Sequence, residues 1–121
     1  MTNEIQTVKN LEQMIDALLV PGTALPVAAP GTPQYKAPRT TLINWIELHN
    51  TDGVGRTVTI HAIPPGGVAG VATNIMAQAL TAGQRLGILS GEVILTGYTL
   101  QLTADAGAVV RASVSGQGQN P

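Results

Sequence analysis

From Thr41 onward, hydrophobic and polar residues alternate in short runs separated by turn-forming residues. The runs lie near residues 41–50, 56–63, 73–80, 85–89, 92–102 and 107–115. Alternation with a period of two is typical of strands that bury one face, and glycine, proline, aspartate and asparagine between them mark turns. Short strands at this spacing favour an antiparallel sandwich or barrel. We expect an all-β, antiparallel β-sandwich of the immunoglobulin-like or jelly-roll-like type.

Two of these runs need a further argument. The stretch Asn74 to Leu80 has residues that also favour a helix, but its hydrophobic positions alternate and it lies between two turns, which favours a strand. Gly97 interrupts the run 92–102 and predicts a bulge or a bend there.

The N-terminal part has a different pattern. Hydrophobic residues recur there at helical spacing: Val8, Leu11, Ile15 and Leu18, joined by Met14 and Leu19. Asn10 and Gln13 form a capping-box-like start, and Pro21 disfavours helical geometry in the residue before it. The pattern therefore predicts a short helix over residues 8–19. Its apolar stripe, with Leu11, Ile15 and Leu18 as candidate interface residues, docks either on the chain's own sandwich or on a neighbouring subunit.

A proline-rich segment follows this predicted helix. Five of the eight prolines fall between Pro21 and Pro38, and proline cannot donate to a sheet ladder. The segment therefore predicts an extended arm or edge strand, with residues 24–29 and 34–37 as the stretches able to pair at an edge. We divide the chain into a helix and arm (1–22), a sandwich domain (23–116, with 23–38 as its proline-rich edge) and a flexible tail (117–121).

The first two strands predict a hairpin register. Pairing Leu48 with Val58 and Ile46 with Ile60 places large apolar residues on one buried face, whereas a shift by one residue does not. The opposite face then carries Ile43, Trp45, His61 and Ile63 at one end. An apolar end on the outer face is a candidate contact surface. Either a neighbouring subunit or the chain's own arm or helix covers it.

Composition narrows the possible functions. The chain has 121 residues, a net charge of −1, no cysteine, 11% charged residues and 2% aromatic residues. The absence of cysteine excludes disulfides, thiolate metal sites and cysteine nucleophiles, and the charge gives no basic footprint for nucleic acid. No apolar run approaches the length of a membrane span, and the polar N-terminus does not resemble a signal peptide. The low proportion of charged residues indicates either a surface that is neutral but hydrated or a surface that is covered by other subunits.

Catalytic and cofactor-binding patterns are missing from the sequence. None of the three serines lies in a G-x-S-x-G elbow, and His49 and His61 are too far apart in the predicted register to share a metal. The carboxylates Glu47, Asp52, Glu92 and Asp105 are scattered over different strands and turns. The glycine-rich loop 64–70 lacks the lysine and hydroxyl residue of a phosphate loop. We therefore expect no enzymatic activity, no cofactor and no metal.

The order of the turn motifs resembles a known group of proteins. The motifs are Asn50-Thr51-Asp52-Gly53, Ile63-Pro64-Pro65-Gly66-Gly67, Ala82-Gly83-Gln84 and the step Gly97-Tyr98-Thr99-Leu100, followed by a final strand from Val109 to Gly116. This order is similar to that of the small all-β structural proteins of tailed bacteriophages. The resemblance covers roughly residues 35–116 and rests on turn signatures; the N-terminal segment lies outside it.

The resemblance implies a virion structural protein. The expected role is that of a capsid decoration (cement) protein, located on the capsid surface after assembly in the bacterial cytoplasm. Its expected partners are the major capsid protein and copies of itself, in a homotrimer, without nucleic acid or membrane. The alternatives are a neck or head and tail fibre accessory protein, or a module that binds the cell surface.

Overall fold

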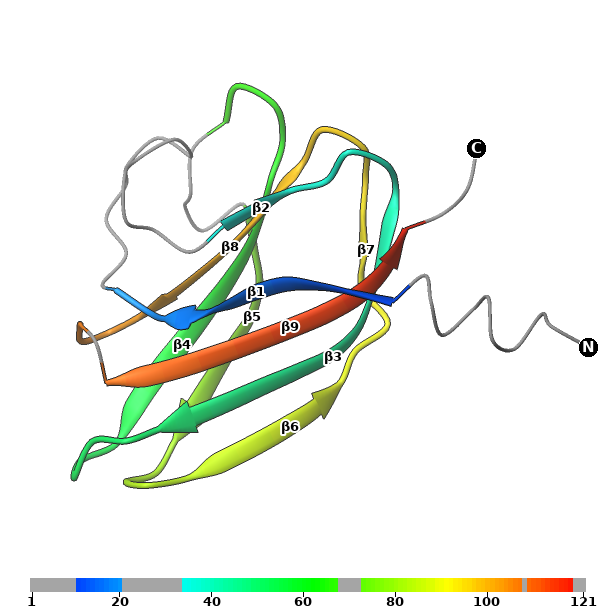
Figure 1. Ribbon diagram of the computed structural model, residues 1–121. Helices are drawn as coiled ribbons and strands as arrows, with labels where there is room; N and C mark the ends of the chain where they lie inside the picture. Colours follow the sequence, from blue (N-terminus) through cyan, green and yellow to red (C-terminus); the bar gives the residue numbers. More distant parts are fainter. Residues whose placement is uncertain (1–10, 21–33, 68–72, 108, 119–121) are drawn as a thin grey trace, which may run out of the picture.

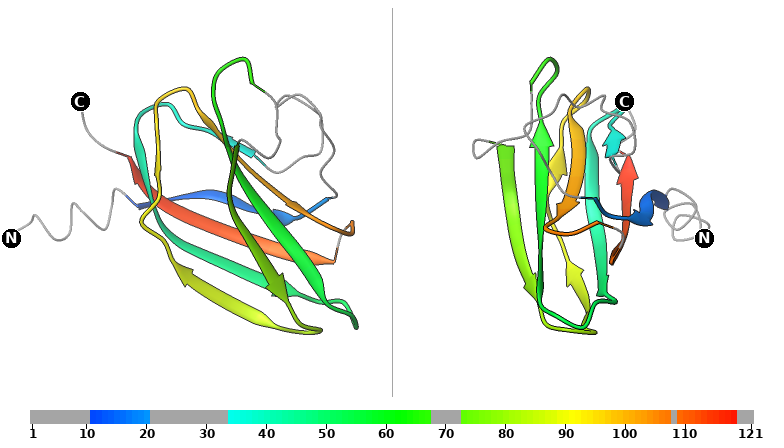
Figure 2. Two further views of the ribbon diagram at one scale, coloured as in Figure 1. Left: turned by 180° about the vertical axis from the view of Figure 1, so that it is seen from behind. Right: turned by 90° about the vertical axis from the view of Figure 1, so that its left-hand side faces the viewer.

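The computed structural model describes residues 11–20, 34–67, 73–107 and 109–118. Within these ranges the chain is all-β, and its strands form two antiparallel sheets that pack face to face (Figure 1). The predicted all-β sandwich is thus confirmed. Seen from behind in Figure 2, the sheet that contains β4 and β5 lies in front of the sheet that contains β3 and β9.

Among the described residues, nine strands make up the two sheets. They are β1 (Leu11–Leu18), β2 (Gln34–Lys36), β3 (Thr41–Asn50), β4 (Arg56–Ile63), β5 (Asn74–Leu80), β6 (Arg85–Leu89), β7 (Val93–Ile94), β8 (Thr99–Ala104) and β9 (Val110–Gly118). The first sheet has the order β1-β9-β3-β6, with β7 also paired to β3. The second sheet has the order β2-β8-β4-β5.

Most strand positions agree with the sequence pattern. Strands β3, β4 and β6 have the predicted bounds, and Asn74–Leu80 is a strand. Gly97 has a φ of +84°, which favours glycine, and it lies in the turn that divides the expected run 92–102 into β7 and β8. Strand β9 continues through Gly118 and so includes the first two residues of the expected tail 117–121.

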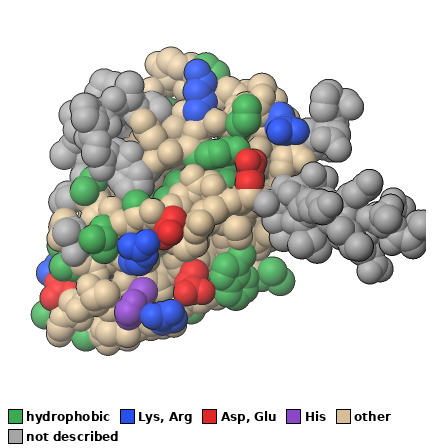
Figure 3. Space-filling view, viewed as in Figure 1, with side chains coloured by type: hydrophobic (Ala, Val, Ile, Leu, Met, Phe, Trp, Pro, Cys, Tyr) green, Lys and Arg blue, Asp and Glu red, His purple; other side chains and the backbone are tan. Residues whose placement is uncertain are grey.

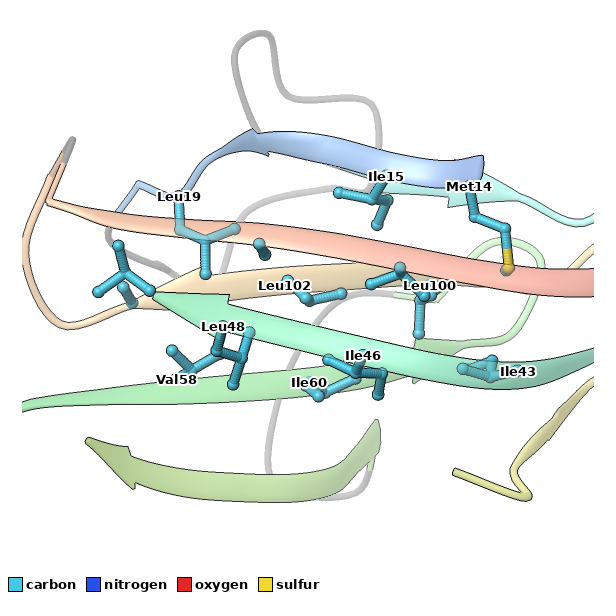
Figure 4. Packing of buried hydrophobic residues seen from close by; sticks show 14 of the residues in the cluster. Met14, Ile15, Leu19, Ile43, Ile46, Leu48, Val58, Ile60, Leu100 and Leu102 are labelled. Atoms are coloured by element: carbon cyan, nitrogen blue, oxygen red, sulfur yellow. The ribbon is translucent and has the colours of Figure 1, made fainter. Parts of the chain in front are cut away.

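The core lies between the two sheets (Figure 4). Ile46 and Leu48 of β3 point toward Val58 and Ile60 of β4, and all four are at most 2% exposed. The other large, fully buried core residues are Leu19, Ile43, Ile94, Leu100, Leu102, Val110 and Val114. Because one face of each sheet is apolar, packing the two faces together removes both from water.

The predicted β3–β4 hairpin is wrong. Strand β3 pairs with β9, β6 and β7 in the first sheet, whereas β4 pairs with β8 and β5 in the second. Leu48 and Val58 therefore meet across the core and not along a ladder. The alternation identified the buried face correctly. A short link such as residues 51–55 can join two neighbouring strands of one sheet, but it can equally cross the roughly 10 Å between packed sheets, as it does here.

Two bulges beside β9 alter which residues face the core. The β3–β9 register shifts between Ile43 and Trp45, and the β1–β9 register shifts between Gln13 and Ile15. Each shift adds one residue to the strand that pairs with β9, so the inward positions of β1 and β3 change phase. For this reason Ile43 and Ile46 are both buried although their numbers differ by three.

The predicted N-terminal helix is also wrong over the described residues. Leu11–Leu18 is strand β1, which pairs along β9 at the edge of the first sheet, and residues 8–10 lie outside the described ranges. Met14, Ile15 and Leu19 are buried, while Leu18 is 45% exposed. The bulge at Met14 places neighbouring residues on the same side, and this broken alternation resembles a helical period in the sequence.

In the described part of the proline-rich segment three residues form an edge strand, and the expected extended arm is not supported. Gln34–Lys36 is β2, the edge strand of the second sheet, where it pairs with β8. The other candidate stretch, residues 24–29, lies outside the described residues. In the described part of the chain, no helix has the length and hydropathy that a membrane span needs.

Candidate interface on the outer face of the first sheet

The four residues predicted to share one exposed face do not share it. Ile43 and Ile63 are fully buried, and His61 is 9% exposed with Nδ1 hydrogen-bonded to Thr73 Oγ1 at 2.9 Å. Trp45 points out from the first sheet and is 41% exposed. The hairpin register that united the four residues is wrong, so Trp45 is separated from His61 and Ile63 by the thickness of the sandwich.

The candidate residues of the N-terminal segment also separate. Leu11 and Ile15 lie in β1, and Ile15 is part of the core at 5% exposure. Leu18, at the end of β1, faces out. Residues three positions apart point to opposite sides of a strand, whereas on a helix they share a face, so Ile15 and Leu18 separate.

Trp45 belongs to an apolar patch that the sequence did not indicate. Its direct neighbour on β6 is Leu89, which is 83% exposed, and Leu42 pairs in the same way with Val93 of β7. These four residues, Leu42, Trp45, Leu89 and Val93, are called the apolar patch below. Exposed apolar residues that lie together, unlike single ones, are typical of interaction surfaces. In Figure 3 an apolar area borders charged side chains on this face.

Charged side chains occupy the other half of the same face. Arg111 donates to Asp16 Oδ1 at 2.7 Å, and Arg85 lies 3.5 Å from Glu47 Oε2. His49 stands between the two arginines, because it pairs with Arg85 on one side and with Arg111 on the other. Each arginine has an acidic neighbour, so this half is polar but close to neutral overall.

A shallow pocket of about 250 Å³ lies within this charged half. It is lined by Glu47, His49, Arg85, Arg111 and Ser113. The arginines and Glu47 are occupied by ion pairs, and the lining side chains are largely open to solvent. The pocket can therefore offer hydrogen bonds to a ligand or a partner, but it lacks the desolvated acid or base of a catalytic site.

Elsewhere in the described part of the chain, an ion pair shifts the pKa of Asp52, and burial shifts that of Tyr35. Hydrogen bonds from Arg56 Nε and Nη2 to Asp52 Oδ2, at 2.9 and 2.7 Å, hold the pKa of the Asp52 carboxyl below its ordinary value, with help from the Gly53 amide. Burial raises the pKa of Tyr35, whose hydroxyl donates to Glu12 Oε1 at 2.8 Å. Both contacts fix local structure: the first holds the 51–55 link, and the second joins β2 to β1.

The outer side of the second sheet carries a buried polar row. Gln34, Gln101 and His61 are neighbours across β2, β8 and β4, and Gln101 is 2% exposed. Among the described residues, the Oε1 atoms of Gln34 and Gln101 have no hydrogen-bond partner. No three potential metal ligands gather anywhere in the described ranges. The row therefore gives no evidence of a metal centre.

The sequence indicated Trp45 but missed Leu42, Leu89 and Val93. Their adjacency depends on the pairing of β6 and β7 with β3, which joins Trp45 to Leu89 and Leu42 to Val93, residues that are 44 and 51 positions apart along the chain. The only local signal was an outward-facing apolar residue near the end of each strand, and single exposed apolar residues are common on protein surfaces.

Comparisons with protein-family models, with curated proteins and with solved structures found no match to this chain.

Proposed function

We propose that the chain is a structural protein of a tailed-phage virion, a decoration protein that binds the capsid surface and bridges major capsid subunits. The observation that carries this proposal is the apolar patch on the outer face of the first sheet, next to a nearly neutral set of ion pairs. A surface of this kind suits contact with another protein, because specific interfaces combine an apolar centre with a polar rim.

The proposed mechanism is burial at the joints between capsid subunits. A protein that binds only the assembled arrangement stabilises it by mass action, since subunits must release the protein before they separate. Trp45 is the expected anchor, because tryptophan is enriched among the residues that dominate interface energies. The homotrimer expected from the sequence is the alternative to the two-fold pairing that is argued in the next subsection.

Within the sandwich class, we infer a jelly roll. The orders β1-β9-β3-β6 and β2-β8-β4-β5 support it, because strands that follow one another in the chain mostly alternate between the two sheets. Jelly rolls are frequent in viral capsid proteins, although a fold shared by many functions does not establish a function.

The direct test is co-sedimentation of the purified protein with capsids that lack it. We expect saturable binding of many copies per capsid, and weaker binding of the Trp45→Ala variant. Thr57→Ala is the matched control, because Thr57 is exposed on the second sheet and far from the patch. Binding of only a few copies at one vertex would instead support a neck or fibre location, and absence of binding would contradict the proposal.

The second candidate is a module that binds the cell surface. The pocket near Glu47 and His49 favours it, because polar side chains beside the exposed Trp45 ring could hold the hydroxyl groups and the apolar face of a sugar. A glycan array measures this binding. Glycan binding that is lost in both Trp45→Ala and Glu47→Ala, while the two variants co-sediment with capsids to the same extent as the wild type, would favour this candidate over capsid decoration.

A further inference from the structure

Strand β6 has one open edge. Asn50 N donates to Gln84 O at 2.8 Å, and Ser90 N donates to Asn44 O at 3.1 Å, so Gln84 and Ser90 turn their backbone toward β3. Hydrogen-bonding direction alternates along an antiparallel strand, which turns the backbone N–H and C=O groups of Arg85, Gly87 and Leu89 away from β3. In the described part of the chain, no strand pairs with these groups.

Within the ranges that the structure describes, this edge lacks the usual protection against strand pairing. Edge strands are commonly blocked by proline, lysine, a bulge or a covering segment. Strand β6 contains none of these residues and pairs with β3 without a register shift. Its only charged side chain, Arg85, lies beside Glu47 of its own chain. Leu89 at its other end is the most exposed large hydrophobic residue of the described chain.

We propose that β6 pairs antiparallel with β6 of a second copy of this chain, about a two-fold axis at Gly87. This register sets Gly87 opposite the second copy's Gly87, and Arg85 opposite the second copy's Leu89. All three outward-turned residues of each copy then take part in the ladder, and the two first sheets become one continuous sheet. A two-fold interface of this kind is closed, so it does not propagate into a filament.

Charge and shape fit this register. No like charges stand directly opposite each other, because each Arg85 faces a leucine and keeps its own Glu47. The aliphatic part of Arg85 can cover the second copy's Leu89. Each Trp45 ring lies over its own Gly87, so the two glycines at the axis leave room for both rings.

The same side of the sandwich holds further apolar surface. Strand β5, which the turn 81–84 joins to β6, is the edge of the second sheet. Met76 of β5 and Leu86 and Ile88 of β6 pack against the core but are only partly buried. A second copy placed along this side would cover them, which adds apolar burial to the backbone hydrogen bonds.

The test is sedimentation velocity of the full chain over a dilution series, with two variants of opposite charge at one site. Leu89→Lys places a cation opposite the second copy's Arg85, whereas Leu89→Glu places an anion there. We expect the wild-type chain to form a dimer. The Kd of the Leu89→Lys dimer should be roughly tenfold higher than that of the Leu89→Glu dimer, because the contact with Arg85 occurs twice in each dimer. Val54→Lys, which changes an exposed apolar residue of the 51–55 link, should leave the Kd unchanged.

Hydrogen exchange on the wild-type chain gives a second readout that needs no variant. The amides of Arg85, Gly87 and Leu89 should exchange slowly at high protein concentration and rapidly after dilution. The proposal would be overturned if the chain were a monomer at every concentration or had the mass of a trimer. It would also be overturned if the two Leu89 variants had equal effects on the Kd, or if these amides exchanged rapidly in the associated state. None of these measurements involves a capsid, so their outcome is independent of the proposed decoration function.

Discussion

The indole ring of Trp45 lies over Gly87 on the adjacent strand, in the space that a larger side chain would fill. A Cβ atom at Gly87 would stand 2.6 Å from Cη2 of the ring and closer still to Cζ2. The two residues are diagonal neighbours, since Gly87 pairs with Glu47. The glycine thus allows the ring to lie flat on the sheet, where it remains 41% exposed.

Gly87→Ala should therefore destabilise the fold. The added methyl group must displace the Trp45 ring, and such overpacking costs about 1–3 kcal/mol. Urea unfolding followed by circular dichroism measures this loss. Gly91→Ala is the matched control, because a Cβ there meets nothing within 4 Å, and its effect should stay within about 0.5 kcal/mol.

A double variant shows whether the ring is the cause. In a Trp45→Ala background the space over Gly87 is free, so Gly87→Ala should then have almost no effect on the free energy of unfolding. An equal cost of Gly87→Ala in both backgrounds would contradict the steric relationship.

Ile43→Ala should cost about as much as other buried isoleucine truncations, about 2–5 kcal/mol. Ile43 is fully buried in the core, next to the β3 bulge. The β3–β4 hairpin register expected from the sequence places it on the outer face instead, where truncation would cost little. Chemical denaturation of Ile43→Ala, Ile46→Ala and the exposed-site control Thr57→Ala separates the two arrangements. Comparable losses for both isoleucines, and none for threonine, are expected.

Local patterns predicted the strands well but not their partners. The bounds of β3, β4 and β6 follow from alternation and turn residues, which act over a few positions. Pairing of β3 with β9 and β6 joins residues that are distant along the chain. Several alternative arrangements of the strands would bury the same apolar faces, so alternation alone does not select one of them. The alternation could therefore show that Ile46 and Ile60 are buried, but not whether they share a sheet or face each other across the core.

The bulges explain the remaining errors. The extra residue, Met14 in β1 and Asn44 in β3, shifts the phase of alternation in its strand. Both bulges pack closely against Gly116 of β9, where a Cβ would lie 2.6 Å from Met14 Sδ and from Leu42 O. Neither contact is visible in the sequence. The apolar patch was found at only one of its four residues, Trp45, because the pairing of β6 and β7 with β3 was not predicted.

Strand β1 can be distinguished from the expected helix by two substitutions. In the strand, Ile15 is buried and Leu18 faces out, so Ile15→Ala should cost about 2–5 kcal/mol and Leu18→Ala far less. On a helix the two residues lie on the same face, and their truncations would have similar costs. Thermal or urea unfolding of both variants makes the comparison, and equal losses would contradict the strand.

The contact between Tyr35 and Glu12 predicts a loss of stability at alkaline pH. Burial and the hydrogen bond to Glu12 raise the pKa of Tyr35 in the folded state above its ordinary value of 10.0. The stabilisation is fully present below pH 10.0. It is lost as the pH rises through the folded-state pKa, because the unfolded chain releases this proton first.

Unfolding free energies measured across that range should fall with pH, and the fall should be less steep in Tyr35→Phe. The phenylalanine keeps the ring packing of β2 but has no proton to release, so the difference between the two slopes isolates the hydroxyl group. Tyr98→Phe provides the control for general effects of removing a phenol, since it leaves the hydrogen bond from Tyr35 to Glu12 in place. Equal slopes in Tyr35→Phe and the wild type would show that this contact between β2 and β1 has no influence on alkaline stability.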